Sequence, residues 1–155
     1  MSKNGSISRL INTSKLVCLP PDATVSDAAK KMSEKHVNAV MVTYRSNLLG
    51  IVTEQDIAFR AIACGLPVDG TSLFEIMTSS PDTLTPNCSV IEALNMMQEN
   101  GYRHVPVVSG GNIVGVISVK DIFNDVRKDM EEDLESLDQF IYGSSYSVDN
   151  IHVAQ

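Results

Sequence analysis

The sequence predicts an α/β fold of the α+β type, built from two tandem copies of one β-α-β-β-α unit around a pseudo-twofold axis. When the chain is shifted by 65 residues against itself, residues 11–57 align with residues 76–122 without a gap. Fifteen of these 47 positions are identical, far more than chance would give. Each copy also shows the same order of apolar patterns, first with the period of a helix and then as two strand-like runs.

Each copy begins with a short extended piece followed by a helix that has recognisable start signals. The extended pieces are residues 17–19 and 83–85. Thr24 with Asp27, and Ser89 with Glu92, are capping side chains followed three residues later by a carboxylate. Apolar residues then recur at the i, i+3, i+4 and i+7 spacing of a helix with one buried stripe. The stripes are Val25, Ala28, Ala29 and Met32 in the first copy and Val90, Ala93, Leu94 and Met97 in the second.

Two apolar, β-branched runs separated by turn residues follow each helix, which predicts a β-hairpin in each copy. The runs are residues 40–43 and 48–53, then residues 105–108 and 113–118. A second helix is expected to open near Glu54 and near Lys120, and in the first copy it ends at Gly65, a natural left-handed cap. A unit of only about 60 residues leaves one sheet face uncovered, so the two copies are expected to pack together.

These patterns divide the chain into four segments. They are the first repeat (8–66), the second repeat (73–128), a C-terminal helix extension (129–142) and a loosely ordered, flexible tail (143–155). The extension carries apolar residues at three- and four-residue steps from Ile122 to Ile141, with an acidic outer face. Such a helix either covers the core of its own repeat or pairs with the same helix of a second chain.

Composition excludes several classes of function. The formal net charge of −7, from 12 Lys and Arg against 19 Asp and Glu, disfavours nucleic acid as a partner. No apolar run approaches the roughly 20 residues of a membrane span, and the polar start lacks the apolar core of a targeting signal. The three cysteines stand at neither metal-ligand nor redox spacing, so we expect no metal site and a reduced, cytoplasmic compartment.

A polar signature of the form G-h-[ILV]-[ST]-x-x-D, in which h is apolar, ends each hairpin. It reads GIVTEQD at residues 50–56 and GVISVKD at residues 115–121, and the second copy adds GYRHVPV at residues 101–107. Over residues 8–126 this gapless doublet resembles a pair of cystathionine-β-synthase (CBS) domains, an arrangement called a Bateman module.

The resemblance implies the CBS-pair fold and a non-catalytic regulatory role. Members of this family bind an adenosine-containing ligand in the cleft between the repeats and transmit its occupancy to a partner protein. Such ligands are AMP, ADP, ATP, NAD and S-adenosylmethionine, and they act as regulators, not as catalytic cofactors. Because such modules commonly pair, the resemblance also favours a homodimer.

The two signatures supply groups that suit adenosine. Asp56 and Asp121, one turn into a helix, can accept charge-assisted hydrogen bonds from both ribose hydroxyls. Thr53 and Ser118, at the start of each helix, can reach phosphate or ribose together with free backbone amides. The same residue pairs are also spaced as ordinary helix caps. The repeat and the family resemblance favour the binding role over capping alone.

Basic residues and one strand of the second copy complete the candidate site. The candidates on this strand are Arg103, His104, Val105 and Pro106. Arg103 and His104 stand where similar modules hold phosphate, and the strand that they open is expected to contact the base. Arg60, on the same helical face as Asp56, and Lys120, inside the second signature, can either reach phosphate or be plain surface residues.

The resemblance also implies that each site borrows its base-contacting strand from the opposite repeat. One pocket is then expected to unite the first signature with Arg103 and His104, and to bind its ligand more tightly. The other is expected to unite the second signature with Asn38 and Ala39, the residues that match Arg103 and His104 in the first copy. Because it lacks an obvious cation, this second pocket is expected to be empty or to hold a less charged ligand.

Three functions are compatible with the sequence. The favoured one is an adenosine-ligand sensor that regulates a partner protein. An enzyme is disfavoured, because the sequence has no nucleophile in a known turn motif, no phosphate-cradling glycine loop and no metal-ligand spacing, so no catalytic residue is assigned. The third is a CBS protein without a ligand that acts only as a dimerisation scaffold.

Overall fold

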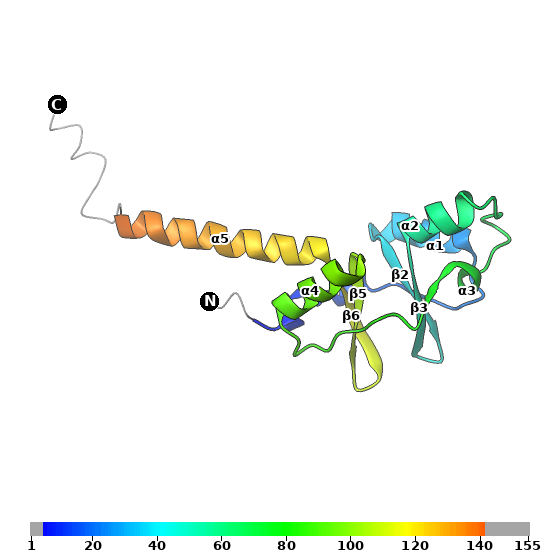
Figure 1. Cartoon of the computed structure of the whole chain (residues 1–155), viewed down its shortest axis with the longest axis horizontal. Coiled ribbons are helices and arrows are strands. Elements are labelled where there is room, and N and C mark those ends of the chain that lie inside the picture. Colours follow the sequence, from blue (N-terminus) through cyan, green and yellow to red (C-terminus); the bar gives the residue numbers. More distant parts are fainter. Residues whose placement is uncertain (1–4, 142–155) are drawn as a thin grey trace, which may run out of the picture.

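The computed structural model describes residues 5–141 of the chain. The tail expected at residues 143–155 lies outside the described residues, as does residue 142 of the expected helix extension. Within the described part, two similar halves each combine a β-hairpin with helices that pack against it, and the two hairpins stand side by side (Figure 1). This architecture confirms the predicted α/β fold of two repeats.

The first half is a four-stranded sheet in the order β1-β2-β3-β4. β1 is parallel to β2, whereas the pairs β2–β3 and β3–β4 are antiparallel. Its elements are β1 (Cys18–Leu19), α1 (Val25–Lys35), β2 (Ala39–Tyr44), β3 (Asn47–Thr53), α2 (Glu54–Asp56), the π-helical segment η3 (Ile57–Ile62), α3 (Leu73–Ile76) and β4 (Thr78–Ser79). The expected extended piece, helix and hairpin of the first copy are confirmed.

The second half repeats this order with fewer paired strands. Its elements are α4 (Val90–Asn100), β5 (His104–Ser109), β6 (Asn112–Ser118) and α5 (Val119–Ile141). A single parallel bridge at Leu84 takes the place of β1. The hairpin registers are equivalent, because Ala39 lies opposite Thr53 in the first and His104 lies opposite Ser118 in the second. The gapless repeat therefore brings matching polar residues to the same end of each hairpin.

The start signals of α1 and α4 act as capping boxes. The Asp27 amide donates to Thr24 Oγ1 at 3.1 Å, and the Thr24 amide donates to Asp27 Oδ2 at 2.9 Å. Ser89 and Glu92 make the same two bonds at 3.1 and 2.8 Å. Each box satisfies amides that have no partner inside the helix, which is why both helices begin where the sequence predicts.

The buried stripe of each helix is narrower than expected. Buried positions are Val25, Ala28 and Met32 in α1 and Val90, Ala93 and Met97 in α4. Ala29 and Leu94, the fourth position of each predicted stripe, are exposed, so the prediction is wrong there. Each helix packs against the rest of its repeat along a single row of residues. The fourth predicted position lies beside that row and therefore faces solvent.

The two halves exchange the segments that precede them. In the 3₁₀ turn η1 (Ile7–Leu10), Ile7 lies in the core of the second repeat, and its amide donates to the Cys88 carbonyl at 2.8 Å. α3 does the reverse, because Leu73 and Ile76 lie in the core of the first repeat. The Leu73 amide donates to the Ala23 carbonyl at 2.8 Å. Each repeat thus receives its last core residues from the segment that opens the other.

A third apolar cluster joins the two sheets. Ala39, Met41 and Ile51 are buried in it, and Ile113 and Val116 of the second repeat pack against them. Together with the exchanged segments, this cluster makes the two repeats one body and places the ends of both hairpins at a common junction.

Most of α5 stands free of this body. Among its described residues only Ile122 is buried. At the base of the helix, Arg9 Nη2 lies 2.6 Å from Asp125 Oδ2 and 3.8 Å from Asp129 Oδ2, and beyond these contacts the helix extends away from the repeats (Figure 1). The interpretation in which the extension covers its own repeat is therefore wrong. None of the helices within residues 5–141 has the length and apolar character needed to cross a membrane.

Candidate functional site

The first of two pockets at the junction unites residues from both repeats. It has a cavity volume of about 260 Å³ and brings Thr53 and Asp56 together with Arg103 and His104. Thr53 ends β3, and Asp56 lies in the turn of helix that follows. Gly101 ends α4 in the left-handed conformation and turns the chain into Arg103 and β5. The structure therefore brings together the four residues expected in this pocket.

The second pocket is the counterpart of the first and is larger, with a cavity volume of about 690 Å³. It brings Ser118 and Asp121 together with Asn38 and Ala39, as expected. Here the left-handed residue that turns the helix into the strand is His36. Arg103, His104 and Glu54 line both pockets, so the two cavities adjoin across these three side chains.

The signature residues are also helix caps. Asp56 Oδ2 accepts hydrogen bonds from the Thr53 amide at 2.8 Å and from Thr53 Oγ1 at 3.2 Å. Asp121 Oδ2 accepts from the Ser118 amide and from Ser118 Oγ, both at 2.9 Å. One oxygen of each carboxylate is thus held in place, and the other oxygen remains for a further donor. Capping and ligand binding are therefore compatible roles for the same residues.

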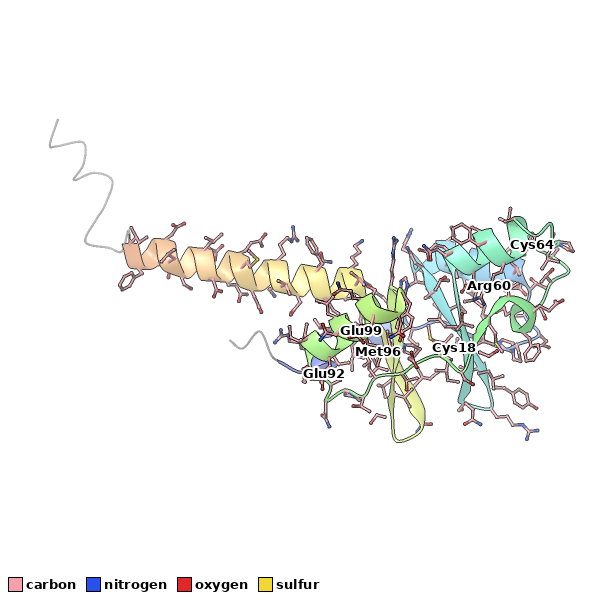
Figure 2. The ribbon with its side chains drawn as sticks, in the orientation of Figure 1. Cys18, Arg60, Cys64, Glu92, Met96 and Glu99 are labelled. Atoms are coloured by element: carbon pink, nitrogen blue, oxygen red, sulfur yellow. The ribbon has the colours of Figure 1, made fainter. Side chains whose placement is uncertain are left out.

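The free oxygen of each carboxylate lies near a cation. Asp56 Oδ1 is 3.6 Å from Arg60 Nε, and Asp121 Oδ1 is 3.6 Å from Lys15 Nζ. The Arg60 guanidinium, labelled in Figure 2, binds the backbone of the first repeat. Its Nη1 donates to the carbonyls of Ile76 and Met77 at 3.1 and 3.2 Å. Arg60 thus ties η3 to the end of α3 and lies outside the lining of either pocket.

The expectation that the second pocket lacks a cation is wrong. Lys15, Lys120 and Arg103 line this pocket, against the carboxylates of Glu54 and Asp121. Lys15 closes the 3₁₀ turn η2 (Thr13–Lys15), which precedes the first strand, and its counterpart in the repeat register is Ser80 of the first pocket. Sequence reasoning compared only the strand positions and so missed Lys15, which lies in a turn that carries no motif of its own.

The first pocket is the more acidic one. Glu54, Asp56 and Asp82 line it, against the single guanidinium of Arg103. The Tyr102 hydroxyl donates to Asp82 Oδ2, and burial, helped by this bond, raises the pKa of Tyr102 to about 12. The formal charges thus run opposite to the expected asymmetry, since the second pocket is the one suited to an anion.

Two of the expected ligand residues lie inside the sheet. Val105 is fully buried in the core of the second repeat. Pro106 is buried opposite Val116, and its carbonyl accepts a hydrogen bond from the Leu84 amide at 2.9 Å. Neither side chain lines the two pockets, whose apolar walls come from other residues. In the second pocket these are mainly Val37, Ala39, Val116 and Phe123.

The imidazole of His104 is an uncharged group at neutral pH. Burial lowers its pKa, and the charge of Arg103 lowers it further, whereas Glu54 and Asp121 oppose the shift without cancelling it. His104 therefore presents a neutral hydrogen-bonding group to the two pockets, and the positive charges along their walls are those of Lys15, Lys120 and Arg103.

Acid should destabilise the fold through His104. Unfolded His104 takes up a proton as the pH falls through about 6.5, whereas the folded residue has a lower pKa and takes it up later. Protonation therefore favours the unfolded state, and the free energy of unfolding is expected to fall between pH 7 and pH 5. Urea unfolding at pH 7, 6 and 5 measures this loss, which His104→Gln should reduce. His36→Gln, at an exposed residue, is the control; an equal reduction by both would contradict the assignment.

Two repeats of one α/β unit that meet at paired pockets define a tandem-repeat module with two candidate ligand sites. The family model of the CBS domain matches residues 6–62 and 73–128. The chain therefore belongs to the CBS-domain family and contains a pair of these domains, as the doubled signature indicated. CBS domain pairs are regulatory modules in general.

Curated relatives share most of the described chain. It is 36% identical over 126 residues to the CBS domain-containing protein CBSCBSPB3 of Arabidopsis thaliana, which covers 81% of this chain and 23% of that protein. It is 33% identical over 127 residues to the mitochondrial protein CBSX3 of the same plant, covering 79% of this chain and 62% of the relative. The chain thus spans less than two thirds of the length of these relatives.

Solved structures share the fold. A CBS domain protein from Pyrobaculum aerophilum, complexed with AMP, is 32% identical with a TM-score of 0.69, covering 75% of this chain and 88% of that one. An uncharacterized conserved protein from Pyrococcus horikoshii is 29% identical with a TM-score of 0.76, covering 82% of this chain and 96% of that one.

Proposed function

We propose that the protein is a non-catalytic regulatory module that binds an adenine nucleotide, AMP, ADP or ATP, in the second pocket. The observation that carries the proposal is the set of groups around this cavity. Its volume of about 690 Å³ falls in the range of roughly 300–1,000 Å³ that is usual for small-molecule sites. The expectation of a tighter first pocket is replaced here by a preference for the second.

Each part of a nucleotide finds a suitable group there. Ala39, Val116 and Phe123 offer an apolar wall for the base. The free oxygen of Asp121 can accept from the ribose hydroxyls in place of its contact with Lys15. Lys15, Lys120 and Arg103, together with the amides that open the 23-residue helix α5, can bind the phosphates. The AMP complex of the Pyrobaculum protein supports this ligand class.

Binding at this place can regulate a partner protein. The pocket is lined by both repeats and by the first turn of α5, so a bound nucleotide touches all three. If the nucleotide binds one relative arrangement of these parts better than another, it shifts the population towards that arrangement. The partner that reads the change is proposed to be a protein outside this chain.

Calorimetric titration with AMP, ADP and ATP tests the proposal. Asp121→Ala is expected to weaken binding about ten- to a hundredfold, because it removes a charge-assisted contact worth about 1.5–3 kcal/mol. Asp56→Ala removes the equivalent cap in the first repeat and is the matched control, with a smaller expected loss. Equal losses would contradict the preference for the second pocket, and release of phosphate from ATP would contradict the non-catalytic role.

A scaffold that works without a ligand is the second candidate, and the exposed apolar residues of α5 favour it. The same titration separates the two functions. If none of the three nucleotides binds, the scaffold is left as the explanation of an architecture of two packed repeats with a free helix.

A further inference from the structure

One face of α5 carries a continuous row of exposed apolar side chains. The row consists of Phe123, Val126, Met130, Leu134, Leu137 and Ile141, each between 45% and 65% exposed. The spacing 3-4-4-3-4 is part of an 11-residue repeat and advances 18 positions, from 123 to 141, in five helical turns. An 11-residue repeat averages 3.67 residues per turn, close to the 3.6 of a straight helix. The row therefore stays on one face for about 27 Å, at 1.5 Å per residue.

The row matches itself when a second copy of the helix runs in the opposite direction. With the two helices centred on Glu132, Phe123 lies opposite Ile141 of the second copy, and Met130 lies opposite its Leu134. Val126 falls within one position of Leu137 in the same alignment. Four of the six apolar positions thus lie directly opposite an apolar position, and Val126 and Leu137 lie one position from each other, so the two rows can pack against one another.

Two charged residues on the edge of the row, Arg127 and Asp138, favour the antiparallel direction. Beyond Lys128 the helix carries acidic residues and no basic one among the described positions, namely Asp129, Glu131, Glu132, Asp133, Glu135 and Asp138. The acids from Asp129 to Glu135 are centred on Glu132 and lie beside the same segment of the second copy in either direction, but a parallel copy also places Arg127 beside Arg127 and Asp138 beside Asp138. An antiparallel copy places Arg127, on the edge of the apolar row, beside Asp138 of the second copy on the same edge.

We propose that α5 is an interaction surface for a second copy of this chain, joined as an antiparallel pair of helices through the row from Phe123 to Ile141. Phe123 also lines the second pocket. The pairing therefore places the end of the second copy's helix beside a residue that lines that pocket. This consequence for the pocket rests on the proposed function, whereas the pairing itself does not.

Sedimentation velocity without nucleotide tests the surface. Met130→Glu with Leu134→Glu, in the middle of the row, is expected to weaken self-association at least tenfold in dissociation constant, because it places four acidic groups inside the pair. Ser136→Glu with Gln139→Glu makes the same charge change on the opposite face of α5 and should leave association unchanged. If the two variants sediment alike, the proposal is overturned. Because no nucleotide is present, failure here is distinct from failure of nucleotide binding.

Disulfide cross-linking tests the direction of pairing. In a protein whose three native cysteines are replaced by serine, a mixture of Phe123→Cys and Ile141→Cys chains should form a cross-linked dimer on oxidation. Either chain alone should not, because identical positions lie about 27 Å apart in the antiparallel pair. Cross-linking of Phe123→Cys with itself, or no cross-linking in the mixture, overturns the antiparallel pair.

Discussion

Ile7→Ala should lower the free energy of unfolding by about 3 kcal/mol, although Ile7 stands ahead of the first repeat in the sequence. Its side chain is fully buried in the core of the second repeat. Replacing a buried isoleucine with alanine removes apolar contacts and leaves a cavity, which costs about 2–5 kcal/mol. The backbone around Ile7 is held by hydrogen bonds to the second repeat, so the site has little freedom to collapse.

Urea unfolding at a constant m-value measures this loss. Ile91→Ala makes the same chemical change at a residue that is 46% exposed on α4, and should lower stability by less than about 1 kcal/mol. Leu73→Ala, on the segment that enters the first core from the other side, should resemble Ile7→Ala. Similar losses for Ile7→Ala and Ile91→Ala would show that the exchanged segment does not contribute to the second core.

The order of the elements could be predicted because its signals are local. Capping pairs, hairpin runs and the left-handed Gly65 each act within a few residues, and the 65-residue repeat supplied the capping and hairpin assignments twice. The exchange of opening segments could not be predicted in this way. Ile7 and Leu73 are apolar residues in short pieces without a period of their own, and only the shape of the opposite core decides where they pack. Ala29 and Leu94 show the same limit, since the width of a buried stripe depends on what faces the helix.

The composition of the pockets was predictable to the extent that the register determines it. Thr53 with Arg103, and Ser118 with Asn38, meet across the repeats as the doubled pattern predicts. The charge of each pocket was not predictable from the register, because Lys15 reaches the second cavity from a 3₁₀ turn with no recognisable motif. Val105 and Pro106 were expected to contact the ligand, but both side chains are buried and line neither pocket. The two residues point to opposite faces of β5, and both faces are covered, so both side chains are buried; a motif match does not include that information.

The two lysines of the second pocket should control the affinity for ATP. Lys15→Ser with Lys120→Ser is expected to weaken ATP binding about thirtyfold, from about 1 kcal/mol for each lysine. Each lysine is expected to contribute less than the about 1.5–3 kcal/mol of a shielded charge-assisted contact, because the Lys15 side chain is 52% exposed and therefore screened by solvent. AMP, with fewer phosphate charges, should lose less, so the double variant should narrow the difference in affinity between ATP and AMP.

Titration of both nucleotides at low and moderate salt measures this effect. Lys30→Ser with Lys31→Ser removes the same two charges from α1, outside the lining of the second pocket, and serves as the matched control. A contact within the pocket acts at short range, whereas general attraction to a charged surface acts on any anion and disappears with salt. If both double variants weaken ATP binding equally, the phosphates are not held by Lys15 and Lys120, and the nucleotide belongs in the first pocket or outside both.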